Sequence, residues 1–128
     1  MNDKNHSILQ SFKFAMTGVK IAIKENRNMK IHFVIAIFVV IFALFLQMSR
    51  LEIAIICIII ILVFSAEMIN TAIEEVINLV TKEYREEARI AKDVSAGMVF
   101  IVAAGSIAVG LLIFLPHIFR FFWFSASN

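Results

Sequence analysis

Three long apolar stretches limit what this chain can fold into. Residues 31–49 and 94–119 contain no Asp, Glu, Lys or Arg, and residues 53–80 are apolar over most of their length. A helix of about 19 residues, with a rise of roughly 1.5 Å per residue, nearly matches a hydrocarbon core of about 30 Å. With 61% hydrophobic and only 17% charged residues, the chain has too little polar surface for a soluble domain. The sequence therefore predicts an all-α membrane protein with three transmembrane helices.

The segment before the first span is amphipathic. Ile8, Phe12, Ala15 and Val19 recur at steps of three and four residues, whereas the lysines of this segment fall on other faces. Such a helix buries its apolar face at the boundary between headgroups and acyl chains. We therefore expect an interfacial helix over about residues 7–29, followed by the three spans within a single domain, residues 1–128.

The basic residues predict the topology. Of the 12 Lys and Arg residues, six precede the first span and four lie between the second and third spans, whereas the first short loop holds only Arg50. Cytoplasmic loops carry an excess of Lys and Arg. The N-terminus and the loop over residues 81–93 are therefore expected in the cytoplasm. The net charge of +2 is too small, and its pattern too diffuse, to indicate a nucleic-acid partner.

The second span carries polar residues where a bilayer disfavours them. At about 100° per residue, five of them fall within roughly 60° of one line along the helix: Glu67, Asn70, Thr71, Glu74 and Asn78. Polar side chains such as Asn and Thr also join membrane helices to one another. Two ionised carboxylates on one stripe are more costly, because each needs a partner, water or a metal, and they indicate a functional site.

Phosphoryl transfer is the chemistry that such a set supports. It needs carboxylates for a divalent cation, a positive charge for the phosphates and a base for the nucleophile's proton. Glu25 on the interfacial helix and the pair Lys92 and Asp93 before the third span are expected on the same leaflet as the stripe. The sequence has no GxxxxGK[ST] loop and no protein-kinase signature set, so those kinase classes are excluded.

Two other classes of membrane protein place polar residues in a helix. A small transporter needs its carboxylates near the midplane and accessible from both sides. A structural subunit uses a polar stripe for contacts between helices. An assay of lipid phosphorylation separates both classes from a lipid kinase.

Three motifs resemble one known family. They are residues 28–32 (NMKIH), 67–74 (EMINTAIE) and 91–97 (AKDVSAG). Together they look like the signatures of the small bacterial integral-membrane diacylglycerol kinase and undecaprenol kinase family. The resemblance covers nearly the whole chain. It implies a homotrimer in the bacterial cell membrane that uses MgATP to phosphorylate a lipid alcohol, in a cytoplasmic active site shared between neighbouring subunits.

The resemblance also implies a role for each matching residue. Glu67 matches the catalytic base, and Asn70 matches the asparagine beside the reaction centre. Glu74 matches a carboxylate that holds Mg²⁺ and so binds the nucleotide, and Lys92 and Asp93 match the nucleotide-binding pair.

This chain departs from the family pattern at two positions. The family's N-terminal metal glutamate is replaced by Asn26, so the neighbouring Glu25 is assigned to Mg²⁺ and the nucleotide, and Asn78 stands where the family often has an acidic residue. The short segments 79–81, 94–97 and 114–116 look more like the undecaprenol kinase branch. We therefore expect undecaprenol as the substrate, with diacylglycerol as the alternative.

Overall fold

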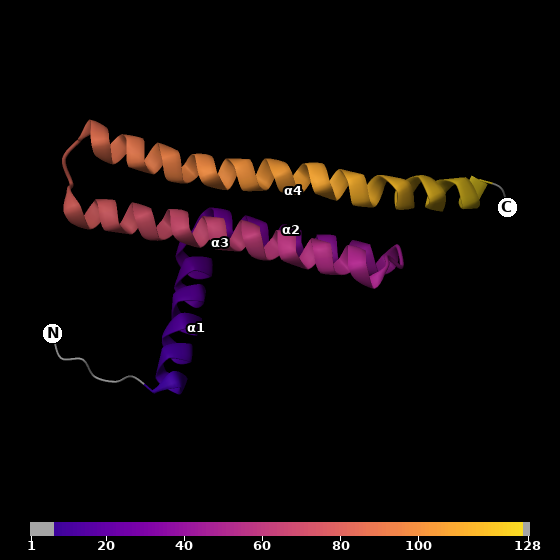
Figure 1. Ribbon diagram of the computed structural model, residues 1–128, viewed down its shortest axis with the longest axis horizontal. Coiled ribbons are helices and arrows are strands. Elements are labelled where there is room, and N and C mark those ends of the chain that lie inside the picture. Colours follow the sequence, from indigo (N-terminus) through magenta and orange to yellow (C-terminus); the bar gives the residue numbers. More distant parts are fainter. Residues whose placement is uncertain (1–6, 127–128) are drawn as a thin grey trace.

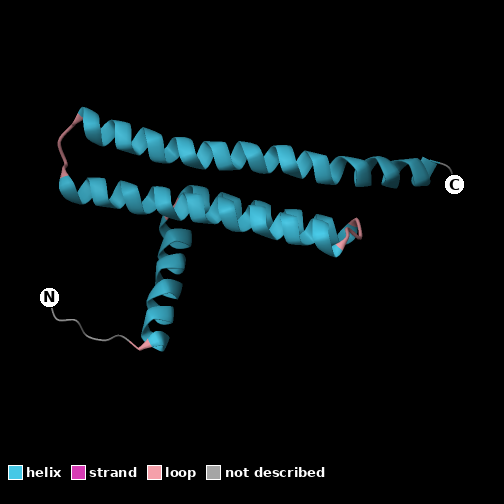
Figure 2. Cartoon of the chain, in the orientation of Figure 1, coloured by secondary structure: helices cyan, strands magenta, loops and turns pink. Residues whose placement is uncertain are grey.

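The computed structural model describes residues 7–126, and the regular structure of this part is entirely helical. The helices are α1 (Ile8–Glu25), α2 (Arg27–Phe45), α3 (Arg50–Val80) and α4 (Glu86–Ala126). Helices α2, α3 and α4 run alongside one another, and α1 lies across them (Figures 1 and 2). Helices α2 and α3 and the part of α4 up to Trp123 are long and apolar enough to cross a membrane. The predicted fold class, three spans preceded by a separate helix, is confirmed.

Helix α1 has the properties of a helix at a membrane surface. It begins with a capping box, in which Ser7 and Gln10 exchange hydrogen bonds between side chain and backbone. Large apolar side chains remain exposed along it, among them Ile8 and Phe12, and only Ala22 is buried. These exposed apolar side chains suit contact with lipid.

The break between α1 and α2 comes at Asn26, earlier than the expected helix end at residue 29. Asn26 has an extended backbone (φ −90°, ψ 120°), and its side-chain oxygen accepts hydrogen bonds from the backbone N–H groups of Asn28 (2.8 Å) and Met29 (3.2 Å). Asn at an N-cap satisfies N–H groups that the helix cannot. The helix that contains the first predicted span therefore begins at Arg27, four residues before residue 31.

The helix of the first predicted span ends at Phe45, before residue 49, because a tight turn follows it. The backbone N–H of Gln47 donates to the carbonyl of Leu44 (3.0 Å), and that of Met48 donates to the carbonyl of Ala43 (3.2 Å). These two bonds form a Schellman motif, which needs a left-handed residue, and Gln47 supplies it with φ 53°. Ala43 and Met48 then pack with Ile56 in a small buried cluster.

Helices α3 and α4 are longer than the bilayer requires. Their 31 and 41 residues correspond to about 46 Å and 62 Å, against a hydrocarbon core of about 30 Å. Helix α4 begins at Glu86 rather than at residue 94, and it continues through Pro116. Near their connecting loop, α3 and α4 extend past α1 (Figure 1). The ends of α3 and α4 next to this loop carry polar and charged residues, such as Glu75, Asn78 and Lys92.

Candidate active site

The most unusual side chain of the molecule is Glu67 of α3. It is 0% exposed, and neither of its carboxylate oxygens has a hydrogen-bond partner within residues 7–126. A buried carboxylate without a partner is costly, because water no longer solvates it and no donor replaces the water. Such a group is a functional-site candidate.

Asn70 connects this part of α3 to α4. Its side-chain N–H donates to Glu74 Oε1 (3.1 Å), and its oxygen accepts a hydrogen bond from the hydroxyl of Ser95 (2.7 Å). Asn70 is 5% exposed and Ser95 is 3% exposed, so both bonds lie in or beside the protein interior. The Asn70 amide therefore fixes the Glu74 carboxylate relative to α4.

Sequence reasoning did not assign a role to Ser95. The residue lies within the AKDVSAG motif and three positions after Lys92, which puts both residues on one face of α4. The spacing of three residues from Lys92 is the feature of the sequence that points to a role for Ser95. The contact with Asn70 joins residues that are 25 positions apart, and a stripe on one helix does not reveal such a contact.

A second pair of hydrogen bonds joins the start of α2 to α3. The Asn26 side-chain N–H donates to the hydroxyl of Thr71 (2.7 Å), which itself donates to the backbone carbonyl of Glu67 (2.9 Å). The side chain of Asn26 thus caps α2 with its oxygen and holds α3 with its nitrogen. The backbone of Glu67 is tied to the junction between α1 and α2.

A cavity of about 530 Å³ lies between α1, the start of α2 and α3. We call it the polar cavity, because its lining includes carboxylates and amides from both sides: Glu25, Asn26, Asn28, Asn70, Glu74 and Glu75. Mg²⁺ is usually held by one or two carboxylates, with phosphates and water completing its shell. The described residues contain no cluster of three or more His, Cys, Asp or Glu side chains for a metal. The carboxylates of the lining, such as Glu25 and Glu74, are the kind of ligand that Mg²⁺ takes from a protein.

Lys92 and Asp93 do not line the polar cavity. The ammonium of Lys92 donates to Asn78 Oδ1 on α3 (2.9 Å). The carboxylate of Asp93, whose side chain is 63% exposed, accepts a hydrogen bond from Arg89 (2.8 Å). Within one chain, the structure thus brings Glu25 and Glu74 to one cavity and leaves the predicted nucleotide-binding pair outside it.

Arg89 organises the exposed beginning of α4, ahead of the apolar run from residue 94. Its guanidinium pairs with Glu86 as well as with Asp93. The hydrogen bond from Arg89 lowers the pKa of the Glu86 carboxyl, and a hydrogen bond from the hydroxyl of Tyr84 (3.0 Å) adds to this effect. Acidic residues in the first turn also suit the positive end of a helix.

Comparison with known proteins identifies the family. The prokaryotic diacylglycerol kinase family matches residues 13–114. The undecaprenol kinase of Bacillus subtilis is 36% identical over 123 residues, which cover 92% of this chain and 100% of the relative. The diacylglycerol kinase of Synechocystis is 36% identical over 111 residues, which cover 86% of this chain but only 63% of the relative. The diacylglycerol kinase of Haemophilus influenzae is 28% identical over 109 residues, which cover 84% of this chain and 92% of the relative. The chain therefore belongs to the prokaryotic diacylglycerol kinase family and is a lipid kinase of that family.

Proposed function

We propose that this protein transfers the terminal phosphate of ATP to a membrane lipid alcohol, and that undecaprenol is converted to undecaprenyl phosphate. The observation that carries the proposal is Glu67, a fully buried carboxylate whose two oxygens lack partners in the described chain. Its neighbour Met68 lines the polar cavity, which Glu25 and Glu74 share. These observations support Glu67 as the base and the polar cavity as the site that would receive the phosphates.

Glu67 is assigned the role of general base. The oxygen of the lipid hydroxyl attacks the terminal phosphorus of ATP, and its proton passes to Glu67. The bond between that phosphorus and the bridging oxygen breaks as the new bond forms, and ADP leaves with the electron pair. Asn70, held by Ser95, keeps the Glu74 carboxylate in place beside this centre.

Glu25 and Glu74 would hold Mg²⁺ together with the phosphates of ATP. The cation would neutralise the charge that develops on the transferred phosphate. The side chain of Asn26 already makes three hydrogen bonds, to Thr71 and to two backbone N–H groups. These bonds support Glu25, rather than Asn26, as the N-terminal ligand.

Lys92 and Asp93 are assigned to the nucleotide, in a site shared between subunits of a homotrimer. In support, the pair lies outside the polar cavity of its own chain. All three spans also expose large apolar side chains that lipid or a neighbouring copy can cover, such as Phe38, Ile61 and Phe100. The symmetry number comes from the family resemblance.

The proposed location is the bacterial cell membrane, with residues 1–128 forming one lipid kinase domain. The N-terminus and the active site are assigned to the cytoplasm. The clustering of Lys and Arg before the first span and between the second and third spans supports this orientation.

The choice of undecaprenol is supported by the Bacillus subtilis undecaprenol kinase, which this chain matches over its whole length. Diacylglycerol remains the alternative, because the Synechocystis diacylglycerol kinase shows the same identity. Both lipids present a primary hydroxyl at the interface, so either could reach the base.

An assay with the purified protein tests the proposal. The protein is supplied with ATP, Mg²⁺ and either undecaprenol or diacylglycerol in mixed micelles, and the phosphorylated lipid is quantified. We expect product from both, with the higher kcat/KM for undecaprenol. Failure to phosphorylate either lipid would remove the kinase assignment and favour a structural or transport role.

A further inference from the structure

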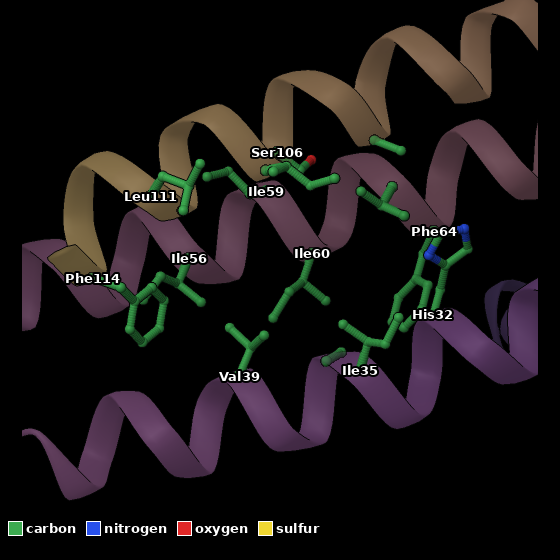
Figure 3. Close-up of a pocket in the computed structure, with 15 residues that line it drawn as sticks. His32, Ile35, Val39, Ile56, Ile59, Ile60, Phe64, Ser106, Leu111 and Phe114 are labelled. Atoms are coloured by element: carbon green, nitrogen blue, oxygen red, sulfur yellow. The ribbon is translucent and has the colours of Figure 1, made fainter. Parts of the chain in front are cut away.

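A second cavity, of about 380 Å³, lies between the three spans (Figure 3). We call it the apolar cavity. Figure 3 shows Val39 and Ile35 of α2 directed towards α3, with His32 and Phe64 at one end and Phe114 at the other. Its lining comes from all three helices and includes Ile35, Val39, Ile56, Ile60, Ser106 and Gly110.

The lining offers almost nothing to a polar ligand. Among the 15 described residues that line the cavity, only His32 and Ser106 have polar side chains. The hydroxyl of Ser106 already donates to the backbone carbonyl of Val102 (2.7 Å). A hydrocarbon chain loses nothing on entering such a space, whereas an ester carbonyl loses its hydrogen bonds to water. Diacylglycerol carries two such carbonyls close to its hydroxyl, and a polyprenol carries none.

The apolar cavity and the buried base belong to one face of α3. Ile56, Ile60 and Val63 line the cavity at helical spacing, and Glu67 follows Val63 after four more residues. Phe64 lies at the same end of the cavity as His32 (Figure 3). It comes three residues before Glu67 in the sequence. A chain in the cavity therefore leads along α3 towards Glu67.

The volume suits one hydrocarbon chain. A methylene group occupies about as much space as a water molecule in the liquid, roughly 30 Å³, so a cavity of about 380 Å³ has room for a segment of a hydrocarbon chain.

We propose that the apolar cavity binds the single isoprenoid chain of the lipid alcohol and selects a polyprenol over a two-chain diacylglycerol. This inference depends on the proposed function, because it assigns the substrate class of that same site. Bound in this way, the chain fills a space that the protein leaves open and directs the hydroxyl towards Glu67.

Gly110 offers a way to close the cavity without disturbing the helices. A Cβ added at this position would meet no atom within 4 Å, although the residue lines the cavity. Gly105 provides the matched control, since a Cβ there also meets nothing within 4 Å but the residue is exposed and does not line the cavity. Gly110→Leu fills the cavity, and Gly105→Leu adds the same side chain to the same helix elsewhere.

The experiment compares the wild-type protein with these two variants. In the absence of ATP, a farnesol analogue with a diazirine on its chain is photolysed, and the crosslinked peptides are identified. We expect crosslinks to the cavity lining in wild type and Gly105→Leu and their loss in Gly110→Leu. With ATP, Gly110→Leu should raise the KM for undecaprenol by about 10-fold, because the new side chain takes the place of three or four methylene groups, which return to micelle hydrocarbon rather than to water. The KM for diacylglycerol and for ATP should stay unchanged.

Three results would overturn the inference. Unchanged crosslinks in Gly110→Leu would place the chain elsewhere, and equal losses for both lipids would remove the selectivity. A change in oligomer size in Gly110→Leu alone, measured by native mass spectrometry, would show that a neighbouring copy fills the cavity. If the wild-type protein phosphorylates neither lipid, the proposed kinase function fails, whereas the crosslinking still decides whether the cavity binds an isoprenoid chain.

Discussion

Along α3, the residues that line the two cavities lie on either side of Glu67, and the two cavities are built in opposite ways. The polar cavity is bordered by α1 and α3 and is held by directional hydrogen bonds, such as those from Asn26 to Thr71 and from Asn70 to Glu74. The apolar cavity lies between the spans and is shaped by side-chain volume alone. Along one face of α3, the contacts thus change from apolar packing to hydrogen bonding within a few helical turns. Substitutions of residues that line the polar cavity should alter turnover and its dependence on Mg²⁺. Substitutions of residues that line the apolar cavity should alter which lipid is preferred.

The largest effect is expected at Glu67, where the two regions meet. Glu67→Gln keeps the size of the side chain but removes the basic carboxylate, so turnover should fall by roughly 10²-fold to 10⁴-fold. Nucleotide affinity, measured by isothermal titration, should change little. Glu83→Gln is the control, because Glu83 lies in the exposed loop between α3 and α4.

Oligomer size and yield of Glu67→Gln separate chemistry from folding. If Glu67 has only a structural role, the activity of Glu67→Gln should fall only in proportion to the amount of assembled protein. Near-normal turnover of a well-folded variant would remove Glu67 from the catalytic role.

The next largest effect concerns the two carboxylates of the polar cavity. Glu25→Gln and Glu74→Gln should each raise the Mg²⁺ concentration needed for half-maximal activity by roughly 10-fold to 100-fold, because a neutral amide replaces a hard anionic ligand. Excess Mg²⁺ should partly restore turnover. Binding of Mn²⁺ in the presence of ATP, followed by electron paramagnetic resonance, reports the same loss without turnover.

Glu87→Gln is the control for both substitutions, since Glu87 is exposed in the first turn of α4. If only Glu25→Gln keeps the wild-type Mg²⁺ dependence, the N-terminal ligand lies at another position. If both variants keep it, the whole metal assignment is wrong.

The sequence predicts more of the fold than of the site, because the two depend on different kinds of contact. Charge-free runs and helical periodicity reveal three spans, since each helix must satisfy its own backbone in lipid. The break at Asn26 is less visible, because Asn interrupts a helix only when it caps the next one. The turn at Gln47 has no glycine to mark its left-handed residue. The Glu67 stripe follows from spacing on one helix, whereas the Ser95 contact depends on how α3 meets α4.

A smaller effect should distinguish the two regions through their serines. Ser95→Ala leaves the buried oxygen of Asn70 without its donor, which costs about 1–3 kcal/mol, and it should loosen Glu74. We expect turnover to fall by about 10-fold with the KM for ATP nearly unchanged. Ser106→Ala removes only a bond to a carbonyl of its own helix and should change turnover little.

Restoration of turnover by Ser95→Thr, which keeps the hydroxyl, would support Ser95 as a positioning residue. If Ser95→Ala lowers thermal stability but leaves turnover intact, the bond to Asn70 serves the fold alone. Equal effects of Ser95→Ala and Ser106→Ala on turnover would contradict the contrast between the polar and apolar regions.

The smallest effect lies at the turn between α2 and α3, away from both cavities. Gln47 adopts a left-handed conformation with φ 53°, which costs a residue with a Cβ about 1–2 kcal/mol, whereas glycine adopts it freely. Gln47→Gly should therefore raise the free energy of unfolding by up to about 1 kcal/mol, since the more flexible unfolded chain offsets part of the gain. Gln47→Val should lower it, because a β-branched residue is strained at positive φ. Reversible unfolding in mixed micelles measures both changes, and lipid phosphorylation by the Gln47→Gly variant should equal that of wild type. Destabilisation by glycine would mean that the side chain of Gln47 makes a contact worth more than the strain it causes.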